Sequence, residues 1–148
     1  MFGRTKGTVR RGTTLIETAF VITLFTMFVF GIIEFGRFLF VRQVVDNAAR
    51  EAARFAVVSS PDTNLEADTQ AIATQRMVGV NNAVTNYQVQ VYQADSAGNK
   101  NGLAGDTPFG SNMAVQIDCD YAPVLPSFLF MGNTIHIRAK VLMNSEAN

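Results

Sequence analysis

The stretch RRGTTLIETAFVITLFTMFVFGIIEFGRF, Arg10 to Phe38, decides how the chain is organised. Between the two arginines and Glu34 the only charged residue is Glu17, and residues 18–33 are uncharged and mostly apolar. As a helix, residues 13–33 would be about 31 Å long, close to the hydrocarbon thickness of a bilayer. No face of this helix is polar, so it is not an amphipathic surface helix. We therefore predict a membrane-inserted helix rather than a buried core helix, which a chain of 148 residues could hardly surround.

Glu17 is the unusual residue of this helix. A carboxylate in an apolar span costs about 2.5–3.5 kcal/mol at mid-membrane and less near an end, so it usually has a partner or a role. If the chain is cut after Gly12, Thr13 carries a free α-amine one helical turn from Glu17. That amine is cationic near neutral pH and would offset the carboxylate, in the same chain or in a neighbouring one.

These residues carry a family resemblance. The basic leader, the glycine and a glutamate at the fifth position of an apolar run resemble the class III signal of type IV pilins. The continuation IEFGRFLFVRQVVDNAAREAARFAV, residues 33–57, is similar to TadE/TadF-like minor pilins (pseudopilins) of the tight-adherence (Tad/Flp) pilus. The resemblance implies that a prepilin peptidase cuts between Gly12 and Thr13, and that Glu17 is an assembly residue. It also implies other pilins and pilus assembly proteins as partners.

Charge indicates how the helix crosses the membrane. Residues 1–12 contain four cationic residues and no acid, which favours a cytoplasmic N-terminus. With the resemblance, this predicts a single-pass protein of the bacterial inner membrane, in contact with lipid. We expect a leader at 1–12, a transmembrane helix at 13–40, a stem continuing the same helix at 41–58 and an extracytoplasmic domain at 59–148. An uncut signal anchor is the competing interpretation. A cleaved secretory signal peptide is a weaker interpretation, because no A-x-A-like cleavage site directly follows the apolar run.

The helix is expected to continue beyond the membrane, because no proline lies between Glu34 and Val58. Its Glu34–Arg37 and Asp46–Arg50 spacings suit ion pairs, and such charges are typical of a solvated helix face. Apolar residues at steps of three or four form one stripe: Phe38, Val41, Val45, Ala48, Ala52 and Phe55. This stripe is expected to pack on the distal domain, on neighbouring helices, or on both.

The distal part is predicted to be α+β. Pro61 ends the first helix, and Thr63 with Glu66 forms a candidate capping box for a second helix, Asn64 to about Val78. Alternating apolar residues predict strands near 87–91, 113–121 and 135–143, and the span Asp95–Asn112 is predicted to be a long loop. The expected fold is a long N-terminal transmembrane and stem helix, a shorter second helix and a small antiparallel sheet of about three to four strands, which is pilin-like.

The sequence contains few candidates for catalytic, metal-binding or nucleic-acid-binding residues. The distal part has twice as many acids as cations, which argues against nucleic-acid binding. His136 lies on a predicted solvent face, and Cys119 lies on the apolar side of its strand, where a small buried hydrophobe is the expected role. Asp118 and Asp120 are expected to pair with Arg138 and Lys140 if their strands are neighbours. We predict no enzyme activity, no metal, no cofactor and no small-molecule substrate.

One connection is apolar enough to mark an interface. Residues 123–131 join the last two predicted strands and include Val124, Leu125, Phe128 and Phe130. Exposed apolar loops mark interaction sites, so we predict contact with another pilus component; the alternative is that the phenylalanines lie under the sheet. Two functions remain: a minor pilin that takes part in assembly of a tight-adherence pilus for surface attachment, or an uncleaved single-pass protein with an extracytoplasmic binding domain.

Overall fold

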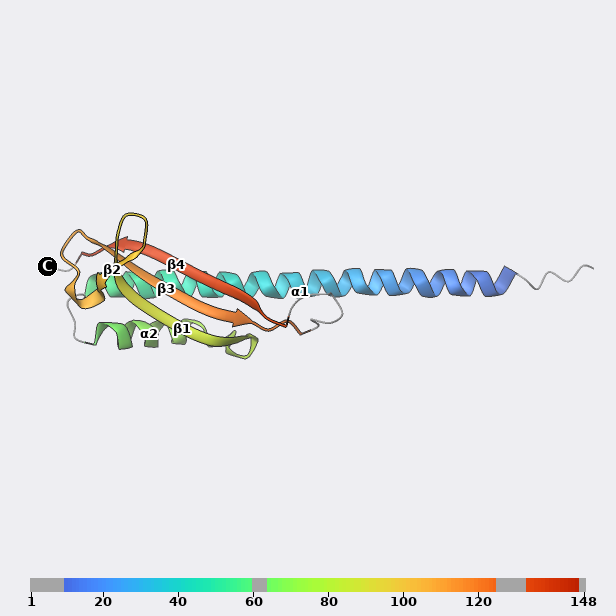
Figure 1. Cartoon of the computed structure of the whole chain (residues 1–148). Coiled ribbons are helices and arrows are strands. Elements are labelled where there is room, and N and C mark those ends of the chain that lie inside the picture. The colour runs from blue at the N-terminus through green and yellow to red at the C-terminus, as the bar shows by residue number, and fades with distance from the viewer. Residues whose placement is uncertain (1–9, 60–63, 125–132, 147–148) are drawn as a thin grey trace, which may run out of the picture.

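The computed structural model describes residues 10–59, 64–124 and 133–146 (Figure 1). Helix α1, Arg10–Ser59, has 50 residues and is therefore about 75 Å long. The remaining elements are α2 (Leu65–Arg76), η1 (Asn81–Ala83), β1 (Val84–Ala94), β2 (Lys100–Leu103), η2 (Ala104–Asp106), β3 (Asn112–Tyr121) and β4 (Ile135–Asn144).

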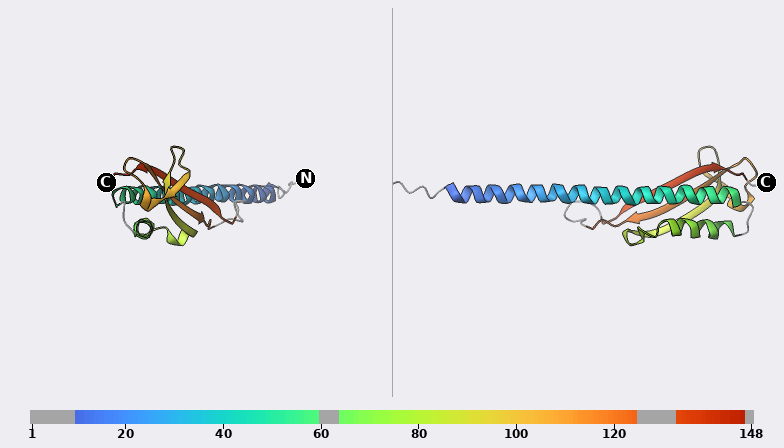
Figure 2. Two further views of the ribbon diagram at one scale, coloured as in Figure 1. Left: turned by 60° about the vertical axis from the view of Figure 1, so that its left-hand side comes forward. Right: turned by 180° about the vertical axis from the view of Figure 1, so that it is seen from behind.

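The four strands form one antiparallel sheet in the order β2-β1-β3-β4. The sheet packs on the C-terminal half of α1, and α2 runs beside α1 beneath β1 (Figures 1 and 2). We call this part, from Glu34 onward, the head. The N-terminal half of α1 projects from the head, and no other described element lies along it (Figure 2). We call this half, up to residue 33, the bare helix. The predicted α+β fold, with a long helix, a shorter helix and a small antiparallel sheet, is confirmed.

The C-terminal half of α1 forms one side of the hydrophobic core of the head. Its alanines are at most 1 % exposed, and they are Ala48, Ala49, Ala52, Ala53 and Ala56. Alanine is the best helix former and has almost no side chain, so the sheet and α2 both approach the helix closely. Val41 and Val45 continue the buried stripe toward the N-terminal half of α1, as predicted, and Phe38 packs against it. Phe55 is only half-buried.

Strand β3 provides the other half of the core. Its alternate residues are fully buried: Met113, Val115, Ile117, Cys119 and Tyr121. Both neighbours pair with it along most of its length, so this strand lies at the centre of the sheet. The alternation predicted from the sequence is therefore correct, and its last inward residue, Tyr121, lies at the C-terminal end of β3, beside Glu34 of α1.

Helix α2 differs in detail from the prediction. It ends at Arg76 instead of Val78, and Asn64 is its N-cap without a side-chain cap hydrogen bond. Its buried residues are Leu65, Thr69 and Ala73, whereas Val78, at the predicted end of the helix, is 68 % exposed. Small residues suffice on the buried face because α2 packs against the alanine-rich surface of α1. Thr63 lies outside the described residues.

The prediction of one long loop from Asp95 to Asn112 is wrong, because β2 lies within it. The sequence KNGL of β2 has no apolar alternation, and its pairing with β1 is short: Tyr92–Leu103, Gln93–Gly102 and Ala94–Lys100. The hairpin is held by Asp95, whose Oδ1 accepts the Asn99 N–H at 2.7 Å. An aspartate that caps a tight turn in this way can set strand pairing without any apolar pattern.

Candidate functional site

The N-terminal half of α1 presents apolar side chains on all sides. Gly12, Thr13 and Glu17 are exposed there, and an 18-residue window of this helix has a mean hydropathy of 2.2 with none of it buried. Thr18 and Thr23 each donate their hydroxyl to the carbonyl four residues earlier, at 2.8 Å. Such bonds satisfy the hydroxyls within the helix, as an apolar solvent requires. By length and composition this helix can cross a membrane.

Glu34 is the buried acid at the base of the head. Its residue is only 4 % exposed. The Tyr121 hydroxyl donates to Glu34 Oε1 at 2.5 Å, and the Val124 N–H donates to the same oxygen at 3.2 Å. Arg37 Nη1 lies 3.7 Å from that oxygen. A buried carboxylate is stable only when it is hydrogen-bonded and paired, and here residues from α1 and from the end of β3 together meet this need.

Tyr121 joins this acid to the aromatic core. Its ring meets Phe38 edge to face at 5.5 Å, and the Arg37 guanidinium carbon lies 5.5 Å from its centroid. Burial and the hydrogen bond to Glu34 raise the pKa of Tyr121 to about 12, so the phenol stays a donor at neutral pH. We call Glu34, Arg37, Phe38 and Tyr121 the junction cluster. It fastens the sheet to the helix where the bare helix enters the head.

The sequence prediction of a solvated Glu34–Arg37 pair is therefore wrong. The i,i+3 spacing is correct, but the acid is buried and its closest partner lies 87 residues away in sequence. The role of Tyr121 was not predicted from the sequence. The available signal was an acid directly at the end of an apolar span, where a carboxylate needs compensation.

A second polar cluster lies on the outer face of β3 and β4. Asp118 Oδ1 accepts from Arg138 Nε at 2.6 Å, and His136 Nδ1 lies 3.0 Å from Asp120 Oδ1. His136 Nε2 lies 3.2 Å from Asp118 Oδ1, so both ring nitrogens face carboxylates. The hydrogen bond with Asp120 is the main cause that raises the pKa of His136 above its ordinary value. The predicted pairing of Asp118 with Arg138 is confirmed, as is the exposure of His136.

Lys140, the other expected cation, is placed differently. Its Nζ lies 5.8 Å from the centroid of the Tyr92 ring on the same outer face. The expected pairing of Lys140 with an aspartate is absent from the ion pairs of the described residues.

Cys119 is a buried free thiol, as predicted. Burial raises its pKa to about 11, with Asp120 and Asp118 adding to the effect. A thiol in this state is a poor nucleophile at neutral pH. No group of three His, Cys, Asp or Glu side chains suited to a metal ion occurs among the described residues.

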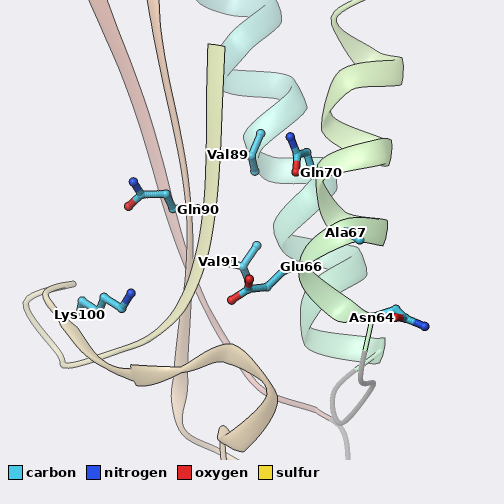
Figure 3. Close-up of a pocket in the computed structure, with 8 residues that line it drawn as sticks. All are labelled: Asn64, Glu66, Ala67, Gln70, Val89, Gln90, Val91 and Lys100. Carbon is cyan, nitrogen blue, oxygen red and sulfur yellow. The ribbon is translucent and has the colours of Figure 1, made fainter. Parts of the chain in front are cut away.

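A groove of about 590 Å³ lies between α2 and the free side of β1 (Figure 3). Its lining is mostly polar and includes Glu66 and Gln70 from α2, Val89 and Val91 from β1, and Lys100 from β2. Strand β2 covers only Tyr92–Ala94 of β1, so the backbone edge of β1 beside this groove pairs with no described strand. The groove can accept a ligand, but its residues do not form a nucleophile–base pair.

The predicted interface segment is described only at its start. Val124 is 62 % exposed, and Leu125, Phe128 and Phe130 lie outside the described residues. Gly12, Thr13 and Glu17 lie more than ten residues before the junction cluster on α1, and the structure does not bring them to it.

These features define a class: a protein with one bare apolar helix that suits a membrane anchor, and an α+β head built on the continuation of that helix. A family model described as TadE-like protein matches residues 12–54. This part of the chain, which holds the bare helix, the junction residues of α1 and most of the stem, is therefore TadE-like, and the resemblance seen in the sequence is confirmed. No curated protein and no solved structure matches the chain.

Proposed function

We propose that this chain is a minor pilin, or pseudopilin, that takes part in assembly of a tight-adherence type IV pilus and has no enzyme activity. The observation that carries the proposal is the TadE-like match over residues 12–54, which coincides with the bare helix and the stem. In this proposal α1 anchors the chain in the bacterial inner membrane, with the N-terminus in the cytoplasm and the head outside. A prepilin peptidase removes the leader after Gly12.

Glu17 is the proposed assembly residue. It is exposed on the apolar half of α1, and it makes no hydrogen bond or ion pair with the described part of its own chain. A carboxylate in lipid gains strongly from a cation in a neighbouring subunit, because the local dielectric constant is low. The free amine of Thr13 in a processed neighbour has the required charge. Glu17→Ala is expected to insert into the membrane normally and to assemble poorly, and normal fibre formation by this variant would remove the role.

The leader is tested by mapping the mature N-terminus in the native host. The mature chain is expected to begin at Thr13, and Gly12→Leu is expected to stay unprocessed. Gly36→Leu is the matched control, because an added Cβ meets nothing within 4 Å at either glycine and both lie on α1. Processing that continues in Gly12→Leu, or stops equally in both variants, would contradict cleavage at this site.

The groove beside β1 favours a second candidate, an uncleaved single-pass protein whose extracytoplasmic head binds a ligand. A groove of about 590 Å³ is within the size range of ligand sites. The N-terminal mapping separates the two candidates, because an intact leader in the mature protein supports the second.

A further inference from the structure

The apolar surface of α1 extends beyond the point where the head begins. Large apolar side chains are exposed on α1 from Leu15 as far as Phe40, and the next one is Val58. The head already contacts the helix at Glu34. Residues 34–40, about 9 Å of helix, therefore carry both the head and exposed apolar side chains.

Length places this overlap at the membrane surface. Residues 13–33 match the hydrocarbon core of a bilayer, about 30 Å thick. The bilayer with its headgroup layers is about 40–45 Å thick, so the outer headgroup layer spans about 5–8 Å, from residue 34 to about residue 38. The exposed Phe35 then lies in the outer headgroup layer, and the exposed Leu39 and Phe40 lie at its outer edge.

The head occupies the same height on the opposite side of the helix. Glu34 and Val41 are buried under the head, whereas Phe35, Leu39 and Phe40 turn away from it. The hydrogen bond from the Val124 N–H to Glu34 fixes Val124 at the level of Glu34, and this valine is 62 % exposed. A headgroup layer that begins at Glu34 on one side of the helix therefore also reaches Val124 on the other.

We propose that the base of the head sits in the headgroup layer of the membrane and that Val124 contacts phospholipid there. The way in which Glu34 is shielded supports phospholipid as the contacting partner. A carboxylate near lipid is costly unless it is shielded, and the head shields it with Tyr121 and the Val124 N–H. Arg42 is exposed one turn beyond Phe38, and its long side chain can extend back toward the lipid phosphates.

This inference rests on the membrane anchoring in the proposed function and not on the pilus role. It is tested with the full chain in nanodiscs of phosphatidylcholine and phosphatidylglycerol, with one copy in each disc so that no second copy can cover the site. A nitroxide is attached at Val124→Cys, and its collisions with oxygen and with a water-soluble nickel complex are measured. Cys119 is buried, and labelling of the unsubstituted chain gives its baseline.

Val58→Cys is the matched control. It is also an exposed valine, 67 % exposed, and lies about 36 Å farther along α1 than Glu34. Phe28→Cys reports on the lipid-embedded part of the helix, where 67 % of Phe28 is exposed. We expect a several-fold loss of nickel collisions at Val124→Cys relative to Val58→Cys, with oxygen collisions retained.

Two results would overturn the inference while leaving the anchoring intact. In the first, Val124→Cys meets the nickel complex as often as Val58→Cys does. In the second, it is shielded from both colliders, which means that protein rather than lipid covers it. Free access of nickel to Phe28→Cys would instead refute the membrane anchoring, and the inference with it.

Discussion

Replacing Tyr121 with phenylalanine removes the hydroxyl that joins the sheet to Glu34 and leaves the ring in place. Phe38 keeps its edge contact and Arg37 keeps its position over the ring. Among the described residues, Glu34 then keeps the Val124 N–H at 3.2 Å and Arg37 at 3.7 Å. A hydrogen bond to a charged group contributes about 1.5–3 kcal/mol, so we expect the head to lose about 2 kcal/mol of its free energy of unfolding.

Tyr92→Phe is the matched control for this substitution. The Tyr92 hydroxyl donates to the neutral Gln116 side chain at 3.2 Å, and such a bond contributes about 0.5–1.5 kcal/mol. Both variants are measured in the full chain in detergent, with urea unfolding of the head followed by alkylation of Cys119, which is buried in the folded state.

The Glu34→Gln background shows where the effect of Tyr121→Phe originates. If the charge of Glu34 is responsible, Tyr121→Phe costs less in this background than in the native chain. The reasoning is refuted if Tyr121→Phe is no more destabilising than Tyr92→Phe, or if its effect is the same with and without Glu34.

Three further predictions use the same unfolding assay. The folded-state pKa of His136 is raised, so the stabilisation by protonated His136 is fully present below the ordinary pKa of about 6.5 and is lost as the pH rises through the raised value. His136→Gln should therefore flatten the plot of urea midpoint against pH in this range, and an unchanged plot would contradict the assignment. Gly98 has a φ of +81°, and an added Cβ would lie 3.0 Å from Leu142 Cδ1, so Gly98→Ala should cost about 1–2 kcal/mol, whereas Gly105→Ala, with open space, should cost much less. Ala52→Leu should cost about 1–3 kcal/mol by overfilling the core, and equal costs for Ala52→Leu and Ala67→Leu on the exposed side of α2 would argue against the close helix–sheet packing.

The elements with strong local patterns were predictable from the sequence. The apolar run before Glu34 identified the bare helix, and the alternation through Cys119 and Ile137 identified β3 and β4 with the correct inward faces. Hydropathy and alternation are local, and each depends on neighbours a few residues away. Tertiary context did not override these signals because each was long and uninterrupted.

The junction cluster was not predictable in the same way. Glu34 and Arg37 have the spacing of an ordinary surface ion pair, and nothing near them in sequence points to Tyr121. The burial of Glu34 depends on how β3 packs on α1, which is set by the whole core. Strand β2 was missed for a related reason, since its backbone pairing with β1 leaves no apolar pattern in KNGL. The buried face of α2 was not predictable in detail, because Thr69 and Ala73 carry little hydropathy contrast.

The most direct test of the account is the fractionation of cells that express the full chain. If the N-terminal half of α1 lies in lipid, the protein stays with the membranes through an alkaline carbonate wash and is released only by detergent. Recovery of the intact, folded chain in the soluble fraction without detergent would contradict the membrane anchor, and with it the proposed function and the placement of the head.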